Sequence, residues 1–462
     1  LFYRNGLEVF KFLLANPVFS GKQNFVPQKC FDEGDVVFFD EPTTAHHMWE
    51  VQVHDGVADG ETLGLVILGS DSTHLSNHTG DKHDHCVYMS CGNIAKDVRS
   101  KISSRCWVKV AQIPVGKFLE TKLNGVLNKR LYHLCMDIVT EALKECSKHP
   151  VLMADADGNM RLVRTILISH IADLPEQQTI ACVGTKSSPI SKARYHQLGI
   201  ATRQELRTGA FTLDQIRSLR EQVDAQNISS YVLKARSIGM NAVHKPYWRN
   251  WEFADPCKFL SPDILHQHHK FFWDHPMDWA KELVGAAELD RRYKALQKHV
   301  GRAHFRKGFT AFKQHTCRES RELQASFIAV IAGAVSPGVM RALRGVMDFI
   351  YLAQFEVQST KTLALLQDAL SRFHADKQHI VDEEGCDDGW HIPKLELMHN
   401  VASLIAQSGS APQYTAERIE RCHIIMSKIP YRATNHKNYE EQMCRHLDRQ
   451  EKIHLFDMYL RW

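Results

Sequence analysis

The sequence predicts an α/β fold in which a mixed sheet is interrupted by a large all-helical insertion. Between residues 61 and 115, three short β-type runs are separated by polar segments, and a long amphipathic pattern follows them. A β-branched run comes next, and from about residue 199 to 407 the pattern is almost entirely helical. These three observations give the element order βββαβ, followed by helices.

The first three runs, residues 63–68, 86–91 and 106–115, predict a meander of three strands, because turn-forming residues separate them. Residues 124–148 carry apolar side chains at steps of three and four, which predicts a helix. A turn at 155–159 leads into a predicted strand at 160–171. This strand ends just before Asp173.

Two Ser-Pro pairs mark the start of helices in the helical region. Ser261 and Ser336 each precede a proline, which is the arrangement of an N-cap followed by proline at the first helical position. Further helices are predicted at 360–374 and 393–407, and a last one from about Thr415. The predicted division is a lead-in at 1–60, the first part of the sheet core at 61–185, the insertion at 186–407 and C-terminal helices completing the core at 408–462.

Composition narrows the class of protein. The chain has 462 residues and a formal net charge of +4, so any nucleic-acid surface has to be a local patch. Its twelve cysteines form no CxxC pair, which favours reduced thiols. The longest apolar run, residues 327–335, is about half of a membrane span, so we expect no membrane partner. Because the chain begins at Leu1 within ordinary sequence, we expect a piece of a longer product.

Two aspartates follow apolar runs of the predicted sheet. Asp71 comes after residues 64–70, and Asp173 comes after residues 166–172. Two strands of one sheet can bring such carboxylates together, and adjacent carboxylates repel unless a cation such as Mg²⁺ or Mn²⁺ lies between them. For either aspartate alone, a turn or cap role is the simpler interpretation. The pair therefore predicts a metal site only if a third ligand joins it.

That third ligand could come from the last predicted helix. Glu417, Glu420 and His423 share one face by their spacing of three residues. The alternative is that acidic residues in a first helical turn favour the helix dipole and pair with neighbouring arginines in solvent.

Asp263 and His266 lie one turn apart on the helix that follows Ser261. The pair could hold a phosphate, a flipped base or a metal. It could equally be a first-turn acid beside a half-buried histidine.

Seven segments, in order along the chain, resemble blocks of the Plavaka family of fungal transposases, relatives of the CACTA-type cut-and-paste elements. The resemblance covers roughly residues 40–462, and its order along the chain makes it more specific than any one block. The segments are GSDSTHLS (69–76), GNIAKDVR (92–99), IADLPEQ (171–177), LSPDILHQ (260–267), DFIYLAQ (348–354), HIPKL (391–395) and YRATN (431–435).

The resemblance implies a ribonuclease-H-like fold with a catalytic DDE triad whose last acid follows the helical insertion. Carried over by residue, Asp71 is the first acid and Asp173 the second. Glu420 is the preferred third acid, with Glu417 as a competitor. Asp263 and His266 correspond to the Asp-x-x-His motif of the insertion.

The implied activity is cleavage and strand transfer of transposon-end DNA. Two Mg²⁺ (or Mn²⁺) ions about 3.5 to 4 Å apart would be held by the three acids. The implied partners are double-stranded DNA and further copies of the chain, and the implied location is the nucleus. Besides Asp263 and His266, the candidate DNA contacts are cations that could also be solvated charges. They are Arg99, Lys101, Arg105, Arg418, Arg421, Lys428, Arg432 and Lys437.

The chain also departs from the family pattern. Where the family usually has a Cys-Pro-x-Cys knuckle after the second acid, this chain has Ser188 and Ser191. Serine does not replace thiolate as a zinc ligand, so no structural Zn²⁺ is expected there. The family's N-terminal zinc-finger region is also missing from this sequence. An alternative function is therefore a transposon-derived DNA-binding or scaffold protein without turnover.

A third candidate is a zinc hydrolase built on the histidine-rich stretch near the first acid. Its ligands would be His74, His78, His83, His85 and Cys86. The stretch lacks an HExxH base, and a loop of this composition is more often solvated.

Overall fold

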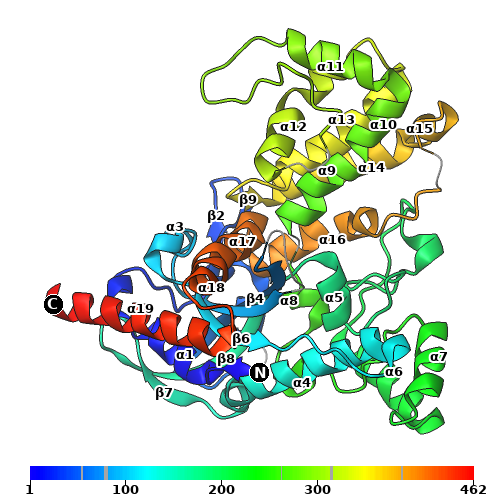
Figure 1. Ribbon diagram of the computed structural model, residues 1–462. Helices are drawn as coiled ribbons and strands as arrows, with labels where there is room; N and C mark the ends of the chain where they lie inside the picture. The colour runs from blue at the N-terminus through cyan, green and yellow to red at the C-terminus, as the bar shows by residue number, and fades with distance from the viewer. Residues whose placement is uncertain (54–55, 77–81, 262, 313–315, 387–388, 462) are drawn as a thin grey trace.

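The computed structural model describes residues 1–53, 56–76, 82–261, 263–312, 316–386 and 389–461, and it is a mixed α/β structure (Figure 1). A six-stranded sheet forms one part and a body of helices forms the other. The body is connected to the sheet part by the chain segments that precede and follow it in sequence. A small second sheet links the two parts. Its strands are β2 (Cys30–Phe31), β3 (Val37–Phe39) and β9 (Gln358–Ser359).

The main sheet has the strand order β1-β6-β5-β4-β8-β7. Neighbouring strands β4, β5 and β6 are antiparallel, whereas β8 runs parallel to β4. Parallel neighbours end at the same edge of a sheet, so the ends of β4 and β8 come together. The strands are β1 (Phe2–Tyr3), β4 (Glu61–His74), β5 (His83–Cys91), β6 (Val108–Ile113), β7 (Val151–Ala154) and β8 (Met160–Ile171).

The predicted order of three strands, a helix and a strand is found. Strand β8 and helix α4 (Asn124–Lys148) have the predicted bounds. Strand β4 continues to His74, beyond the predicted end at residue 68, because its polar end still pairs with β5 along the whole register. Strand β7 was not predicted, since four residues give too short a pattern.

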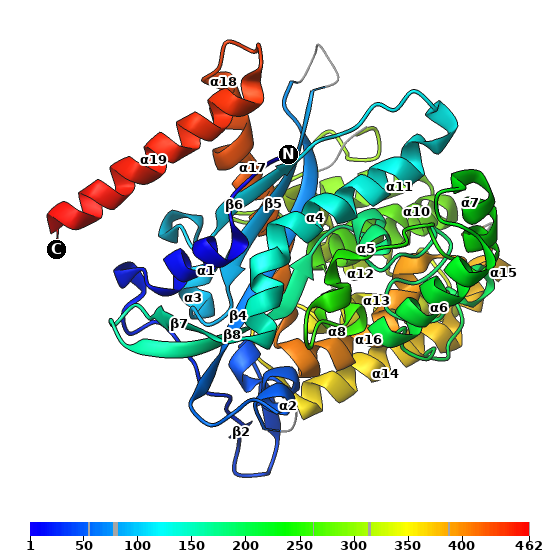
Figure 2. The same cartoon turned by 90° about the horizontal axis from the view of Figure 1, so that it is seen from below.

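Helices cover both faces of the main sheet. Helix α1 (Gly6–Leu14) packs beside α4 on one face (Figure 2). Gly64 permits this, because a Cβ there would lie 2.8 Å from Cε1 of Phe10 in α1. Successive strand residues face opposite sides, so Gly69, five positions later, faces the other side. There it meets Ile419 of α17 (Glu417–His423).

The remaining helices belong mostly to the helical body and the C-terminal part. Before the body lie α2 (His46–Val53), α3 (Lys96–Arg99) and α5 (Leu174–Ile180). The body holds α6 (Gly209–Gln222), α7 (Ile228–Ser237), α8 (Pro256–Phe259), α9 (Lys270–Asp274), α10 (Pro276–Val284), α11 (Ala286–Ala295), α12 (Cys317–Ile331), α13 (Pro337–Leu352), α14 (Thr360–Asp376), α15 (Gln378–Asp382) and α16 (Pro393–Ser408). Helices α18 (Ile429–Arg432) and α19 (Tyr439–Arg461) end the chain.

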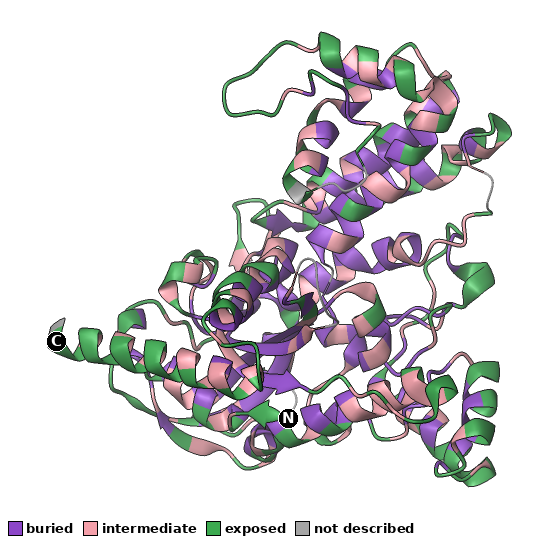
Figure 3. Ribbon diagram, viewed as in Figure 1, coloured by how far each residue is buried: buried purple, intermediate pink, exposed green. Residues whose placement is uncertain are grey.

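Buried side chains form separate cores, visible as purple segments in the sheet and in the helical body (Figure 3). The sheet core takes in Tyr247 and Trp248, although they lie within the predicted insertion. The main core of the helical body comprises residues between Ile264 and Ala411, together with Phe39 of β3. The chain therefore leaves the sheet for the helical body near residue 263 and returns near residue 416. These two places are close in space, where the Ala416 N–H donates to Asp263.

Two predicted helix starts have different outcomes. Ser336 caps α13 by accepting a hydrogen bond from the Val339 N–H, as predicted. The predicted cap at Ser261 is wrong: the cap is Asp263, whose carboxylate accepts from the N–H groups of Leu265 and His266 at 3.0 and 3.1 Å. An aspartate accepts two backbone N–H groups at once, which favours the later start.

The end of the chain holds more helix than predicted. The expected helix near Thr415 begins as α17 at Glu417, and a π-helical turn (Ile424–Lys428) leads from it into α18. Helix α19 then extends away from the rest of the molecule (Figure 2). In the described part of the chain, no helix has both the length and the apolar content that a bilayer crossing needs.

Candidate active site

Asp71 lies on β4 two residues after Gly69, so it faces α17 as Gly69 does. Its Oδ2 is 3.2 Å from Nε2 of His423, and its Oδ1 accepts from the Ser72 N–H at 2.7 Å. The other ring nitrogen of His423 lies 3.0 Å from the Tyr88 hydroxyl. Because these contacts leave the Asp71 side chain 30% exposed, part of the carboxylate still faces solvent.

Asp173 caps helix α5 at the neighbouring strand end. Its Oδ1 accepts a hydrogen bond from the Glu176 N–H at 2.9 Å. Burial raises the pKa of Asp173 to about 6, and the nearby charges of Glu176 and Asp71 act in the same direction. The two aspartates predicted to meet therefore lie close enough to repel each other.

Glu420 lies on α17, one turn before His423, and is near Asp71 and His266. Burial raises the pKa of Glu420, and the charges of Asp71 and Asp263 add to that effect. Its Oε1 is 3.7 Å from Nε2 of His266. The competitor, Glu417, forms an ion pair with Arg321 instead. Of the two glutamates, Glu420 is therefore the one recorded beside Asp71 and His266.

The predicted pair Asp263 and His266 is formed, with 2.5 Å between Oδ2 of Asp263 and Nδ1 of His266. Oδ1 of the buried Asp263 also accepts from the Ala416 N–H at 2.9 Å, just before α17. Burial alone would lower the pKa of His266, but Asp263, Glu420 and Asp173 outweigh it and raise that pKa to about 9. His266 is therefore a cation at neutral pH, placed among the acids.

Together, Asp71, Asp173, Asp263 and Glu420 can carry more negative charge than the single positive charge of His266 neutralises. Among the residues that the structure describes, no three His, Cys, Asp or Glu side chains are arranged as a formed metal site. Carboxylate oxygens are nevertheless the ligands that Mg²⁺ and Mn²⁺ prefer, and a bound cation would relieve the repulsion that the charge of Asp71 exerts on Asp173 and on Glu420. The donor set therefore fits such ions.

A family model described as Plavaka transposase matches residues 1–280, more than half of the chain. The chain belongs to the Plavaka transposase family. Membership makes the protein a transposase and DNA its partner, which confirms the resemblance found in the sequence. No curated protein matches the chain significantly.

The family match includes some of the candidate residues and not others. Asp71, Asp173, Asp263 and His266 lie within residues 1–280. Glu420 lies beyond the match, so its place in the site depends on the geometry described above. The match also begins at residue 1, earlier than the start near residue 40 that the sequence blocks indicated.

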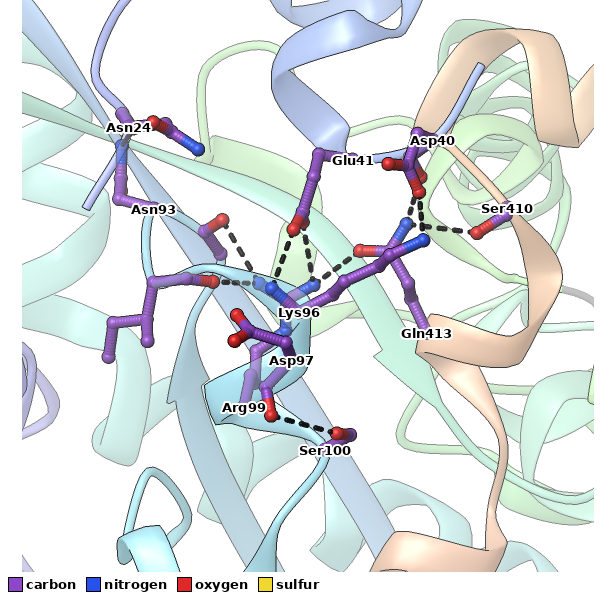
Figure 4. Close-up of polar contacts among 12 residues, drawn as sticks. Asn24, Asp40, Glu41, Asn93, Lys96, Asp97, Arg99, Ser100, Ser410 and Gln413 are labelled. Carbon is purple, nitrogen blue, oxygen red and sulfur yellow. Dashed lines mark hydrogen bonds and ion pairs between the residues drawn. The ribbon is translucent and has the colours of Figure 1, made fainter. Parts of the chain in front are cut away.

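A polar network joins residues 40–41, helix α3 and the segment before α17 of this transposase (Figure 4). Glu41 accepts from the Lys96 N–H at 2.6 Å and pairs with Arg99 at 3.5 Å. Arg99 also donates to Gln413, and the Gln413 amide donates to the backbone carbonyl of Asp40. The segment that leads into α17 is therefore held by two chain regions that are distant in sequence.

The burial of Arg99 does not fit its predicted contact with DNA. The side chain is fully buried and its donors also bind the carbonyls of Gly92 and Ile94. Arg418 is half-buried, donates to the Gln413 carbonyl, and has its pKa lowered to about 10 by burial and by Arg99. The other predicted cations remain accessible: Lys101, Arg105, Arg421, Arg432 and Lys437 are exposed, and Lys428 is half-buried.

A buried polar network below Asp71 was not assigned from the sequence. The Glu176 carboxylate accepts from the Ser70 hydroxyl and lies 3.1 Å from Nε2 of His85. Burial would raise the pKa of Glu176, but His85 and Ser70 bring it down to about 2. Tyr132 and His170 bind Ser70 from the other side. Glu176 follows Asp173 by three residues, and this helical spacing was the only signal for it.

The histidine-rich stretch does not assemble the zinc hydrolase site. His74 and His83 stack across the β4–β5 pair, with ring centroids 4.0 Å apart. His85 is turned to Glu176, and the buried Cys86 thiol lies 3.0 Å from the Ser427 hydroxyl, with its pKa raised by burial to about 12. His78 lies outside the described residues.

The two serines at the family's knuckle position are buried and hydrogen-bonded. The Ser188 hydroxyl accepts from the N–H groups of Ile190 and Ser191 at 3.2 and 3.1 Å. The Ser191 hydroxyl donates to Glu396 of α16 at 2.6 Å. These hydrogen bonds close the turn where the family usually places thiolates.

Proposed function

We propose that this transposase is of the DDE type and that Asp71, Asp173 and Glu420 are its catalytic acids, in a ribonuclease-H-like core. The observation that supports the proposal is that the charge of Asp71 on β4 acts on both Asp173, at the start of α5, and Glu420, on α17, and raises the pKa of each. They come from positions far apart in the chain, and only the fold brings them together. The antiparallel meander, the crossing helix α4 and the parallel strand β8 agree with such a core.

The three acids would hold Mg²⁺ or Mn²⁺. When bound, such ions supply an activated water or 3′-hydroxyl and stabilise the departing oxygen of the scissile phosphate. The chain itself fixes the geometry. His423 orients Asp71, the α5 N-terminus orients Asp173, and Asp263 holds the start of α17 through the Ala416 N–H.

His266 provides the positive charge of the site at neutral pH. Its Nε2 lies 3.7 Å from Glu420, and its Nδ1 is held by Asp263. A protonated ring in this position lowers the repulsion among the acids and attracts a phosphate. This role needs His266 to stay charged, which the buried Asp263 secures.

The proposed products are cleaved transposon ends joined to target DNA, with double-stranded DNA as substrate. Exposed Lys101, Arg105, Arg421 and Arg432 are the proposed backbone contacts near the acids. We also propose assembly of several copies on the two DNA ends and a nuclear location, both of which follow from the proposed reaction.

The test is cleavage of a labelled DNA duplex carrying the element's ends, in Mg²⁺ or Mn²⁺. Asp71→Asn and Glu420→Gln should each lower the cleavage rate at least roughly a hundredfold, since metal binding contributes several kcal/mol to the transition state. Glu417→Gln is the matched control and should keep the rate within a few-fold. Unchanged cleavage in Asp71→Asn and Glu420→Gln would contradict the assignment.

The same experiment addresses a DNA-binding scaffold without turnover. The observation that favours a scaffold is the serine pair at 188 and 191 where the family has thiolates. Binding of the duplex by the unmodified chain, with no cleavage in either metal, would support the scaffold and overturn the enzyme.

A further inference from the structure

A cavity lies between the start of α4, the loop after α5 and the end of α7, and none of the acids is among its lining residues. Its volume is about 430 Å³. The cationic residues that line it are Lys122, Lys129, Lys186 and Arg236. No acidic side chain is among its described lining residues. Cations gathered without acids in a cavity are typical of sites that bind anions.

The four cations are not engaged in ion pairs that would neutralise them. The ion pairs recorded across the described residues include none of the four. Lys186 lies 4.6 Å above the Tyr195 ring, which holds the side chain without cancelling its charge. Burial lowers the pKa of Lys129, and the neighbouring Arg236 charge lowers it further. Lys129 is half-buried and the other three cations are exposed, so a bound anion would reach all four from solvent.

Two backbone segments that line the cavity, residues 184–187 and the residues after α7, pack closely against each other. Gly239 has φ +79° and accepts at its carbonyl from the Gly184 N–H at 2.9 Å and from the Ser187 hydroxyl at 3.1 Å. A Cβ at Gly239 would lie 2.9 Å from the Ser187 hydroxyl, so glycine is required there. Loop 184–187 is thus fixed against the end of α7, with Lys186 on it.

The N-terminus of α4 adds to the positive potential. Gly125 and Val126, in the first turn of this 25-residue helix, line the cavity. No side chain caps the helix at Leu123; a 3-10 turn (Thr121–Leu123) precedes it, and the Thr121 carbonyl accepts from the Asn124 N–H. A helix N-terminus favours anions, and here it opens into a cavity that already holds four cations.

We propose that this cavity binds phosphodiester groups of the DNA, at a distance from the site of cleavage. The inference rests on the proposed function only in that DNA is the partner. Helix α5 begins next to Asp173 and spans about 10 Å, and loop 184–187 follows shortly after it. Ten base pairs of duplex extend roughly 34 Å, which is enough to contact both places.

The test measures binding of a 30-base-pair duplex of arbitrary sequence, in EDTA, at several salt concentrations. Sequence is immaterial because phosphate contacts carry no base information. Lys129→Gln/Arg236→Gln should raise the dissociation constant roughly tenfold. The slope of its logarithm against the logarithm of salt concentration should fall by the equivalent of about one to two phosphate contacts. Its thermal midpoint should stay equal or rise, because the paired like charges are removed.

The matched control removes two cations that form exposed ion pairs elsewhere. Lys148 pairs with Glu145 at the far end of α4, and Arg217 pairs with Asp214 on α6. Lys148→Gln/Arg217→Gln makes the same change in net charge and should leave the salt dependence unchanged. If the first double variant fails to fold, Lys122→Gln/Lys186→Gln alters exposed side chains and gives the same readout.

Two results would overturn the proposal. One is a dissociation constant and salt dependence equal to those of the control. The other result would come from thermal unfolding measured with and without inorganic phosphate. If the double variant binds the duplex normally but is no longer stabilised by phosphate, the cavity is a site for a small anion. Because the measurement is made without metal, loss of duplex binding supports the cavity even if the chain never cleaves DNA.

Discussion

Asp173 carries a free-energy cost that the unfolded chain does not have. Its pKa is raised to about 6 in the folded protein from an ordinary value of 3.8, chiefly by burial. The folded state therefore binds more protons than the unfolded state between these values, and the free energy of unfolding falls as pH rises through that interval. Such a cost at a carboxylate fits a position meant for a cation.

Asp173→Asn should therefore stabilise the metal-free protein. We expect the free energy of unfolding to rise by on the order of 1 to 2 kcal/mol at pH 7.5, and the gain to shrink toward zero near pH 4. Asparagine keeps the α5 cap, so the helix start is preserved. Urea unfolding in EDTA at both pH values measures the difference.

The control for Asp173 is Asp214→Asn, an exposed carboxylate on α6, which should change stability by less than about 0.5 kcal/mol. A variant at Asp173 that is less stable than the unmodified chain at pH 7.5 would show that the carboxylate supports the fold instead.

At this scale the sequence indicated the acids but not their surroundings. Asp71 and Asp173 follow apolar runs, a local pattern that a single sequence contains. Arg99 looked like a surface cation because its acceptors, on Glu41 and Gln413, are 58 and 314 residues away. Glu176 likewise pairs with His85, which is 91 residues away in the sequence. Burial set by distant partners has no local signal.

Strand β4 and helix α17 meet through one glycine. A Cβ at Gly69 would lie 2.9 Å from Cγ1 of Ile419, so any larger residue displaces α17 from the sheet. Because α17 carries both His423 and Glu420, its distance from β4 sets the distance between the first and third acids. The close contact of these two elements therefore positions the site.

Gly69→Ala should cost about 1 to 3 kcal/mol of stability and reduce cleavage, because the overpacked contact moves α17. Replacing Ile419 with valine in the same chain should restore part of both losses. Denaturant unfolding and cleavage rates are the readouts, with Gly34→Ala, where a Cβ would meet only Asp32 Oδ1 at 3.4 Å, as control. Equal cleavage in Gly69→Ala and the control would mean that α17 does not position the acids.

Helix α3 and the lead into α17 depend on the buried Arg99. Arg99→Gln leaves Glu41 with a weakened partner in a buried network, so we expect a loss of roughly 3 to 5 kcal/mol in the free energy of unfolding. Lys101→Gln, two residues away and exposed, should change stability by less than about 0.5 kcal/mol. Weaker DNA binding by a fully stable Arg99→Gln would restore Arg99 to the DNA-binding set.

The elements themselves were well predicted where a pattern is long. Helix α4 and strand β8 have many periodic residues, whereas β7 and the two-residue strands have too few. The start after Ser261 was misplaced because Asp263 caps the turn more completely than serine does. Helix α19 was missed because its apolar residues follow no single face, and much of it is exposed.

Across the whole molecule, the helical body separates the third acid from the first two in sequence but not in space. The body has its own core, formed by residues between Ile264 and Ala411 together with Phe39 of β3. Asp263 joins its beginning to its end through the Ala416 N–H. A single buried carboxylate thus connects the two ends of the insertion beside the acids. The order of elements in the sequence predicted the insertion, but this closure depends on the three-dimensional path.

The central claim is that Asp71, Asp173 and Glu420 jointly bind divalent cations. Calorimetric titration of the metal-free protein with Mn²⁺ tests it most directly, using the unmodified chain, Asp71→Asn, Asp173→Asn and Glu417→Gln. The account predicts binding by the unmodified chain and by Glu417→Gln, and loss of at least roughly tenfold in affinity for each aspartate variant. Equal Mn²⁺ affinity in all four proteins would contradict it.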